Sequence, residues 1–253
     1  MNRSTELPPL SPNAWLRWAV VSKLLPPNAR DALEVGCGQG GFGARLAERY
    51  RYVGVDLDAV SAQVAQSRLA ALGPAGSGEI RIGDLSVLAD DELFDLVCAF
   101  EVIEHIEDDR SALKEWVGRL RPGGWLLLST PAHPHRFGPA DVMAGHFRRY
   151  EPAALAGLLA EAGLVDAQVT HFGMPLGYAL EAGRNAVGRR RVARRPDADM
   201  STRTHGSGRL LQPTGRGTGT VTRLGTLPFR AVQRAFPNHG PGLVARARKP
   251  ADG

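Results

Sequence analysis

Hydrophobic and polar positions alternate over short segments of the chain and recur at helical spacing between most of them. Alternation predicts β-strands, and a period of three to four residues predicts helices. Because parallel neighbours need a crossover, strands separated by helices predict a parallel, doubly wound α/β sheet. The expected strands are 32–35, 52–57, 79–82, 94–100, 125–129, 164–172 and 242–248, and the expected helices are 13–25, 42–50, 59–72, 110–120 and 152–162.

Composition places the chain among globular proteins of one large or two small domains. No apolar run among the 253 residues approaches the roughly 18 to 20 that span a bilayer, which excludes an integral membrane protein. The N-terminus carries Arg3 without the apolar segment of a secretory signal, so we expect a cytoplasmic protein. Cys37 and Cys98 are too few for a disulfide scaffold and are expected to be reduced thiols.

Positive charge is concentrated in the last part of the chain. Residues 1–182 carry 16 Lys and Arg against 23 Asp and Glu, a net charge of −7, whereas residues 183–253 carry 15 against 3, a net charge of +12. The overall charge of +5 therefore belongs to the C-terminal quarter. Such a segment suits phosphate, an anionic substrate or a lipid surface, or it is simply a solvated loop.

A glycine-rich loop follows the first expected strand and opens a helix. Glycines let the backbone approach a ligand closely, because they lack a Cβ and adopt positive φ. Asp56 ends the second strand, 20 residues after Gly36, where a carboxylate can accept hydrogen bonds from a ribose diol. Both features also fit a nicotinamide dinucleotide-binding domain, so that alternative stays open at this point. The loop reads Glu34-Val35-Gly36-Cys37-Gly38-Gln39-Gly40-Gly41.

Further motifs favour a different cofactor. Asp84 ends the third strand, FDLV opens the fourth at Phe94, and the exit of the fourth reads EVIEHI from Glu101. In this order the motifs resemble those of class I S-adenosylmethionine-dependent methyltransferases, particularly the branch with the ubiquinone-biosynthesis O-methyltransferases. The block LRPGGWLLLSTP from Leu120 is similar to that branch as well. The resemblance covers about residues 28–172 and the last strand.

The resemblance implies a Rossmann-like, doubly wound and mostly parallel seven-stranded sheet with an antiparallel last strand. It divides the chain into an N-terminal helical segment, residues 1–27, and a methyltransferase domain, residues 28–253. Within that domain, residues 174–240 would form a basic, lid-like insertion between the last two strands.

The cofactor implied by the resemblance is S-adenosylmethionine, which leaves as S-adenosylhomocysteine. Glu34 would lie beside its methionine part and Asp56 beside its ribose. Leu57, Asp84 and Leu85 would surround the adenine, although both leucines are ordinary core residues by composition and Asp84 could be only a helix N-cap. The remaining residues that the resemblance assigns to the cofactor are Gly36, Cys37, Gly38, Gly40 and Glu101.

Acidic and imidazole side chains leave the fourth strand together, beside the expected position of the transferred methyl group. Methyl transfer from a sulfonium needs alignment and, for a hydroxyl acceptor, a proton sink, a role that suits histidine. We therefore expect His105 and Glu101 to be catalytic. The cluster also resembles the magnesium ligands of some ubiquinone-pathway and small-RNA methyltransferases, so a metal site and a purely structural role both stay open. The candidate metal ligands are Glu101, Glu104, His105 and His146.

Basic residues follow in the loop after the fifth strand. Loops at the carboxyl edge of a sheet line the ligand crevice, so Arg148 and Arg149, together with His146, are expected to bind the acceptor, for instance through a carboxylate or phosphate. The alternative is that one arginine pairs with an acidic side chain of the domain.

The insertion favours an anionic acceptor, with a solvated loop as the alternative. It holds no Phe, Tyr or Trp between Gly183 and Pro228, which argues against RNA recognition. Its one expected helix, residues 229–236, places apolar residues on one side and Arg230 and Arg234 on the other. Such a stripe more often packs on a core than on a membrane, so membrane contact is a minor hypothesis.

Together these observations predict methyl transfer from S-adenosylmethionine to a small-molecule acceptor, with oxygen favoured over nitrogen. RNA 2′-O-methylation with a divalent metal and small-molecule N-methylation are the alternatives. The sequence leaves the acceptor and the oligomeric state open.

Overall fold

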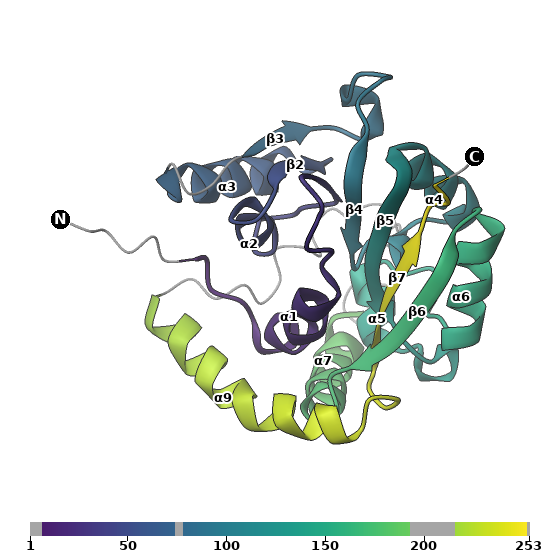
Figure 1. Ribbon diagram of the computed structural model, residues 1–253. Helices are drawn as coiled ribbons and strands as arrows, with labels where there is room; N and C mark the ends of the chain where they lie inside the picture. Colours follow the sequence, from purple (N-terminus) through teal and green to yellow (C-terminus); the bar gives the residue numbers. More distant parts are fainter. Residues whose placement is uncertain (1–6, 74–77, 193–215, 252–253) are drawn as a thin grey trace.

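A seven-stranded sheet with helices on both faces organises the computed structural model, which describes residues 7–73, 78–192 and 216–251 (Figure 1). Its strand order is β3-β2-β1-β4-β5-β7-β6, and only β7 runs antiparallel to its neighbours. The expected fold class is therefore confirmed. The strands are β1 (Asp31–Val35), β2 (Arg51–Asp56), β3 (Gly78–Ile82), β4 (Phe94–Phe100), β5 (Leu120–Pro131), β6 (Val165–Phe172) and β7 (Gly242–Arg248).

Side-chain caps explain where several helices begin. The side-chain oxygens of Ser11, Asp58 and Asp108 each accept a hydrogen bond from a backbone N–H of the first turn that follows. The α-helices are α1 (Pro12–Leu24), α2 (Gly43–Ala47), α3 (Ala59–Ala70), α4 (Asp109–Gly118), α5 (Pro139–Ala144), α6 (Pro152–Glu161), α7 (Leu176–Val192) and α9 (Arg216–Ala235), with short 3₁₀ turns η2 (Leu85–Val87), η3 (Ile103–His105) and η4 (Pro134–Arg136).

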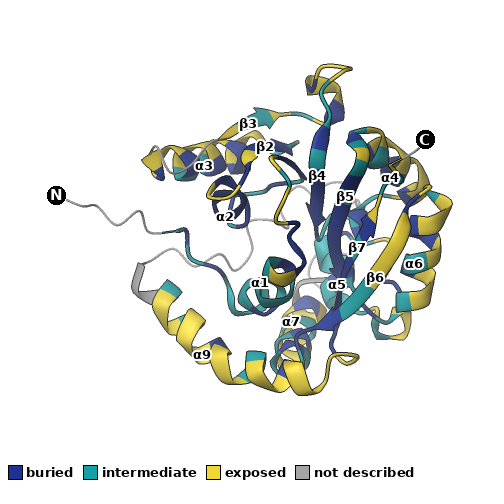
Figure 2. Ribbon diagram, viewed as in Figure 1, coloured by how far each residue is buried: buried dark blue, intermediate teal, exposed yellow. Residues whose placement is uncertain are grey.

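The core consists of two apolar layers, one on each face of the sheet. Alternate residues of β4 point to opposite faces, so that Val97 belongs to one layer and Cys98 to the other. One layer contains residues of α4 and α6, and the other contains residues of α1, α2 and α3. The central strands are accordingly the most deeply buried part of the fold (Figure 2).

The insertion between β6 and β7 is more helical than the sequence indicates. The helix expected at residues 229–236 is the end of α9, which begins at Arg216, and α7 was not expected. Glycines and threonines made the first half of α9 resemble a loop. The structure uses one of them for close packing, because a Cβ on Gly219 would lie 2.7 Å from Cβ of Pro9. Residues 193–215 of the insertion lie outside the described residues.

Helix lengths and hydropathies bear on membrane insertion. In the described part of the chain, no helix is both long enough and apolar enough to cross a membrane. α9 has 20 residues, but four of them are arginines.

Replacing Leu127 with Ala is expected to destabilise the fold by about 2–5 kcal/mol, because the deletion leaves a cavity in the centre of the sheet. Leu127 is fully buried on β5. The free energy of unfolding is measured by urea denaturation followed by circular dichroism. Val165→Ala on β6, where the side chain is 45% exposed, is the control and is expected to change it by less than about 0.5 kcal/mol. A Leu127→Ala variant as stable as this control would contradict the packing described.

Candidate active site

The loop after β1 presents bare backbone at the carboxyl edge of the sheet. Three of its four glycines, Gly36, Gly38 and Gly40, have φ angles of 68°, 53° and 71°, a region that non-glycine residues rarely adopt. A Cβ on Gly40 would lie 2.9 Å from Cβ of Ala65 in α3, so the loop also packs tightly against the neighbouring helix. The shape of the loop therefore requires these glycines. The loop places its backbone N–H groups near the carboxyl ends of the strands.

Asp56 at the end of β2 is held in one orientation by the backbone. One carboxylate oxygen accepts a hydrogen bond from the Gly38 N–H at 2.6 Å, and the other accepts one from the Asp58 N–H at 2.8 Å. A carboxylate has about four acceptor positions, so both oxygens keep capacity for two further donors. Asp56 is thus built to receive a pair of hydroxyl groups beside the glycine loop.

Apolar side chains are exposed beyond Asp56, where β2 and β3 end. Leu57 is 65% exposed and Ile82 is 52% exposed, and Ile82 pairs with Asp56 across the sheet. Asp84 is exposed as well, and its side chain accepts a hydrogen bond from the Ser86 N–H at the start of η2. Leu85 is buried in the core. Leu57, Ile82 and Asp84 form a surface suited to a flat, partly polar ring.

Glu34 lies at the inner end of the glycine loop, on β1. It is buried and accepts a hydrogen bond from the Tyr52 hydroxyl at 2.6 Å. Burial is the largest influence and raises the pKa of Glu34 to about 8, against the opposing hydrogen bond from Tyr52. The carboxyl group is therefore mostly protonated at neutral pH, and a cationic ligand nearby would favour its ionisation.

Glu101 turns the chain at the exit of β4. Its φ of 58° is unusual for a residue with a side chain. Its carboxylate forms an ion pair with Arg17 of α1 at 2.8 Å and accepts a hydrogen bond from the Ser129 hydroxyl at 3.0 Å. Burial opposes ionisation, but Arg17, Ser129 and His146 together hold the pKa of Glu101 below its usual value. Glu101 therefore carries a charge that Arg17 compensates.

Glu104, His105 and His146 form a compact group beside Glu101. One side-chain donor atom from each lies within 4.8 Å of the others, and the two imidazole rings meet edge to face with centroids 4.6 Å apart. Glu104 is fully buried, and burial followed by the charge of Glu101 raises its pKa well above the usual value. Asp141 fixes the ring of His146 through a 2.8 Å contact with Nδ1.

His105 is neutral at physiological pH. Burial, followed by the neighbouring His146, lowers the pKa of His105 to about 4. Among the described residues, three buried polar atoms near this point have no hydrogen-bond partner: Nδ1 of His105, Oε1 of Glu104 and Nε of Arg17. Such atoms are costly to bury unpaired, so a water molecule or a polar ligand group that reached them would lower this cost.

The expected metal set is only partly assembled. Glu104, His105 and His146 lie together, whereas Glu101 is outside the group of mutually close donor atoms and pairs with Arg17 instead. Two imidazoles and one carboxylate are a donor set that a divalent transition metal accepts. The geometry thus fits a three-residue site better than the four-residue site that the sequence suggested.

The arginines expected to bind the acceptor are already paired. Arg149 is buried and contacts Asp141 at 2.7 Å and Glu181 at 3.1 Å. Arg148 pairs with Asp109 at 2.7 Å. Both guanidinium groups are therefore engaged by acidic side chains of the domain, and their role in binding an acceptor stays a prediction. Of the three residues expected to bind substrate, only His146 lies in the group around His105.

Two functional neighbours were missed from the sequence. Arg17 reaches the site from α1 and lies with its guanidinium 5.1 Å from the centre of the Phe42 ring. A charged residue between Leu16 and Trp18 in an apolar helix was the available signal. Asp141, which orients His146, lies on the unexpected helix α5.

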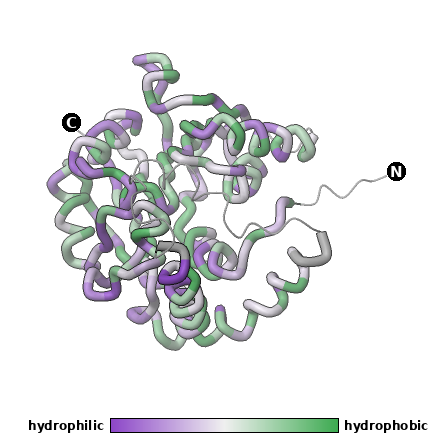
Figure 3. Tube along the Cα trace, turned by 180° about the vertical axis from the view of Figure 1, so that it is seen from behind, coloured by the Kyte–Doolittle hydropathy of each residue, from purple (hydrophilic) through white to green (hydrophobic). Residues whose placement is uncertain are grey.

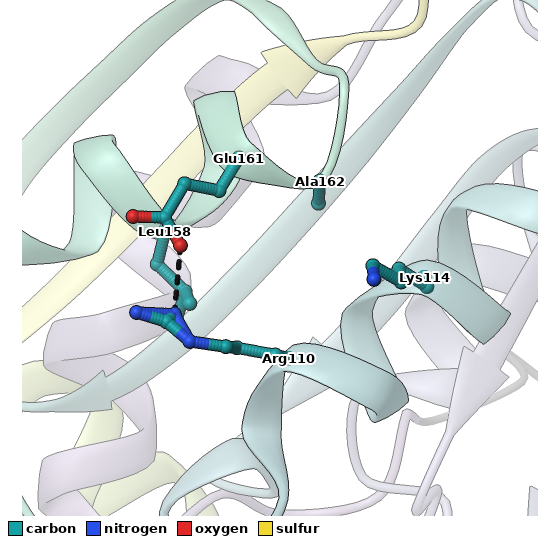
Figure 4. A pocket seen from close by; sticks show the side chains of 5 residues that line it. All are labelled: Arg110, Lys114, Leu158, Glu161 and Ala162. Atoms are coloured by element: carbon teal, nitrogen blue, oxygen red, sulfur yellow. Dashed lines mark hydrogen bonds and ion pairs between the residues drawn. The ribbon is translucent and has the colours of Figure 1, made fainter.

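A separate small pocket lies between α4 and α6, away from these residues (Figure 4). An ion pair of 2.7 Å between Arg110 and Glu161 crosses it. None of the candidate site residues lines it, so the site is assigned at the carboxyl ends of the strands, where ligands of open α/β sheets bind. The lining residues are Arg110, Lys114, Leu158, Glu161 and Ala162.

Sheet order, glycine loop and Asp56 define a Rossmann-like nucleotide-cofactor domain, and sequence relatives specify it further. Residues 33–126 match the family described as a methyltransferase domain. The chain is 34% identical over 165 residues to a probable S-adenosylmethionine-dependent methyltransferase of Mycobacterium tuberculosis, covering 61% of this chain and 57% of that protein. It is 36% identical over 131 residues to a ubiquinone biosynthesis O-methyltransferase of Paracidovorax citrulli, covering 50% and 54%. The chain thus spans little more than half the length of these relatives.

Solved structures agree on the fold. Phosphoethanolamine N-methyltransferase 2 of Haemonchus contortus, in complex with S-adenosyl-L-methionine, superposes with a TM-score of 0.60 at 18% identity, covering 98% of this chain and 54% of that one. The YcgJ protein of a Bacillus superposes with a TM-score of 0.60 at 15% identity, covering 94% and 98%. Residues 33–126 thus belong to a class I S-adenosylmethionine-dependent methyltransferase domain, whose cofactor is S-adenosylmethionine.

The site's shape and chemistry fit this cofactor. A Cβ on Gly38 would have no heavy atom within 4 Å, so the bare backbone at this glycine leaves room for a ligand. Asp56 keeps acceptor positions for a ribose diol, and the exposed faces of Leu57 and Ile82 offer an apolar surface for adenine. Glu34 offers a carboxyl group to the ammonium of the methionine part. The assignment of these residues to individual parts of the cofactor remains a prediction.

Asp56→Ala is expected to lower the affinity for S-adenosylhomocysteine at least 100-fold, because the variant loses the ribose acceptor and the support of Gly38. Isothermal titration calorimetry measures the affinity. The control is Asp91→Ala, an exposed carboxylate in the loop before β4, which is expected to bind like the wild type. Affinity within a few-fold of the wild type for Asp56→Ala would remove Asp56 from the cofactor site.

His105 is expected to titrate near pH 4, because burial and His146 disfavour its charged form. An unfolded histidine titrates near 6.5, so the contribution of His105 to stability is complete above about pH 6.5 and is lost as the pH falls through about 4. NMR of ¹³C-labelled imidazole follows the titration, and His105→Gln assigns the signal. A midpoint above pH 6 would contradict the burial described.

Proposed function

We propose that the protein transfers the methyl group of S-adenosylmethionine to a hydroxyl oxygen of a small-molecule acceptor. The observation that carries the proposal is the group of buried polar atoms without partners at the exit of β4, contributed by Arg17, Glu104 and His105. They lie near Glu101, which follows β4, the strand that pairs with β1 and leads away from the same sheet edge as the glycine loop. An acceptor with polar groups would satisfy them where the cofactor site ends.

The cofactor half of the site binds S-adenosylmethionine and orients its methyl group. When bound, S-adenosylmethionine supplies an electrophilic methyl group on a sulfonium. Asp56 would hold the ribose, the glycine loop would lie along the methionine part, and Glu34 would receive its ammonium group. These contacts align the methyl group with an acceptor at the exit of β4, and alignment is the main contribution an enzyme makes to such a displacement.

The acceptor half supplies a place for the proton. As the new oxygen–carbon bond forms, the acceptor hydroxyl loses its proton, and the unpaired Nδ1 of His105 is the nitrogen that can accept it. Its low pKa keeps His105 neutral and able to accept a hydrogen bond throughout the neutral pH range. The proton then passes to water, because His105 releases it readily.

Electrostatics favours a hydroxyl over an amine. Burial raises the pKa of Glu104 well above its usual value, His105 is neutral, and the charge of Glu101 is compensated by Arg17. A protonated amine would gain little from such a site, because no uncompensated carboxylate among the described residues faces it. A neutral hydroxyl pays no comparable desolvation cost.

A metal-assisted variant of this reaction is supported by one observation. Donor atoms of Glu104, His105 and His146 lie within 4.8 Å of one another. A divalent ion there would hold the acceptor oxygen and lower the pKa of its hydroxyl, and His105 would then be a ligand. Metal dependence of the activity distinguishes the two mechanisms.

His105→Ala is expected to lower turnover at least 100-fold while the affinity for S-adenosylhomocysteine changes less than threefold, because the residue serves the acceptor half alone. The assay follows labelled methyl from S-adenosylmethionine into small molecules of a bacterial extract, with nuclease-treated fractions separated. His135→Ala is the matched control, since this histidine follows β5 with a side chain 72% exposed.

The same assay with and without EDTA tests the metal. Transfer that EDTA leaves unchanged supports His105 as the proton acceptor, and transfer lost with EDTA and restored by a divalent ion supports the metal-assisted variant. An unaltered rate for His105→Ala would refute both roles. Label found in nuclease-sensitive material would replace the small-molecule acceptor with RNA.

A further inference from the structure

Helix α9 is amphipathic with its polar side turned toward the protein. It lies at the outer edge of the fold and packs beside α1 (Figure 1). Thr226 is 2% exposed and Gln233 is 9% exposed, although both are polar. Threonine and glutamine thus share the inner side with Phe229, which is partly buried against the core, although an ordinary surface helix places mainly apolar residues there.

Hydrogen bonds hold this polar side in place. The side-chain oxygen of Gln233 accepts from the Met174 N–H at 2.6 Å, and its nitrogen donates to the carbonyl oxygens of Phe236 and His239. Thr222 donates to the Leu10 carbonyl oxygen at 3.2 Å. These bonds tie α9 to the N-terminal segment and to the loop after β6, so the orientation of the helix is fixed by specific contacts.

The opposite side of α9 is apolar and faces outward. Val221, Leu224 and Leu227 follow one another at intervals of three residues with exposures of 70%, 58% and 45%, and Val232 and Phe236 continue the stripe. Figure 2 shows most of the helix exposed, with buried and intermediate segments between, and hydrophobic positions recur along it in Figure 3. Among the described residues, nothing covers this stripe. Exposed apolar patches of this kind mark interaction sites.

Arginines border the stripe. Arg223 and Arg230 are seven residues apart and therefore lie near one line along the helix, and Arg234 follows one turn later. α9 contains no Asp or Glu. Burial lowers the pKa of Arg230, and the positive charges of Arg234 and Arg223 lower it further. These like charges lie close enough to repel one another, and an anionic surface would relieve that repulsion.

We propose that α9 binds the surface of an anionic lipid bilayer, with its apolar stripe inserted among the acyl chains and its arginines at the headgroups. The combination of an exposed apolar stripe, bordering arginines and no acidic residue is what an interfacial helix requires. Charge complementarity favours this occupant over a second copy of the chain, because two copies would bring together two helices that carry arginines and no Asp or Glu. The proposal is independent of the proposed methyl transfer.

Binding is measured with the full chain by flotation on extruded vesicles of phosphatidylcholine, with or without 30 mol% phosphatidylglycerol. The wild type is expected to float with the anionic vesicles, at least tenfold more than with the neutral ones, and to lose binding as salt is raised to 0.5 M. The double variant Leu224→Ser and Leu227→Ser is expected to bind at least tenfold less. Its matched control is Val165→Ser with Val187→Ser, whose side chains are 45% and 46% exposed away from α9.

Several outcomes would overturn the proposal. These are a wild type that does not float, a stripe variant that floats like its control, or equal binding to neutral vesicles. A concentration-dependent dimer in light scattering that the stripe variant abolishes would assign the stripe to a second copy.

Affinity for S-adenosylhomocysteine and thermal unfolding are expected to be unchanged in both double variants. Failure of cofactor binding in the wild type would remove the proposed function and leave the vesicle result standing.

Discussion

Two loops approach each other so closely at the carboxyl edge of the sheet that residue 36 has no room for a side chain. A Cβ on Gly36 would lie 2.6 Å from Cγ2 of Val102, and its φ of 68° disfavours other residues as well. Because the loop after β1 meets the exit of β4 here, Glu101 turns beside the cofactor loop and meets Arg17. The cofactor and acceptor halves of the site therefore share one wall.

How far the sequence predicted the fold depended on burial. β4 has the expected bounds, because a parallel strand buried on both faces consists almost wholly of apolar residues. The helices of the insertion were missed in part, since α9 begins with glycines and threonines of low helix propensity and is held by tertiary contacts. Of the apolar residues expected to pack on a core, Phe229 does so, whereas Val232 and Phe236 face outward. Periodicity shows which residues share a face, and only the fold shows what that face meets.

The sequence predicted the positions of site residues that lie at strand ends. It was less informative for residues whose position depends on an ion pair. Asp56 lies beside the glycine loop as expected. Arg149 was expected at the acceptor but is held by Asp141 and Glu181, residues on helices that the pattern did not indicate. Arg17, distant in sequence, compensates Glu101. The role of a charged side chain depends on the partners nearest to it, and the tertiary fold determines which residues those partners are.

The position of β7 has a consequence for how the chain folds. β7 lies between β5 and β6, although it follows β6 by about 70 residues along the chain. Until β7 arrives, β5 has an unpaired edge and β6 has no neighbour in the sheet, so the second half of the sheet forms by a long-range closure. Such closures are slow because their loop entropy is lost before any contact is gained. During that interval the open edge of β5 is the surface most prone to pairing with another chain, and a chaperone that covers it would raise the yield of native protein.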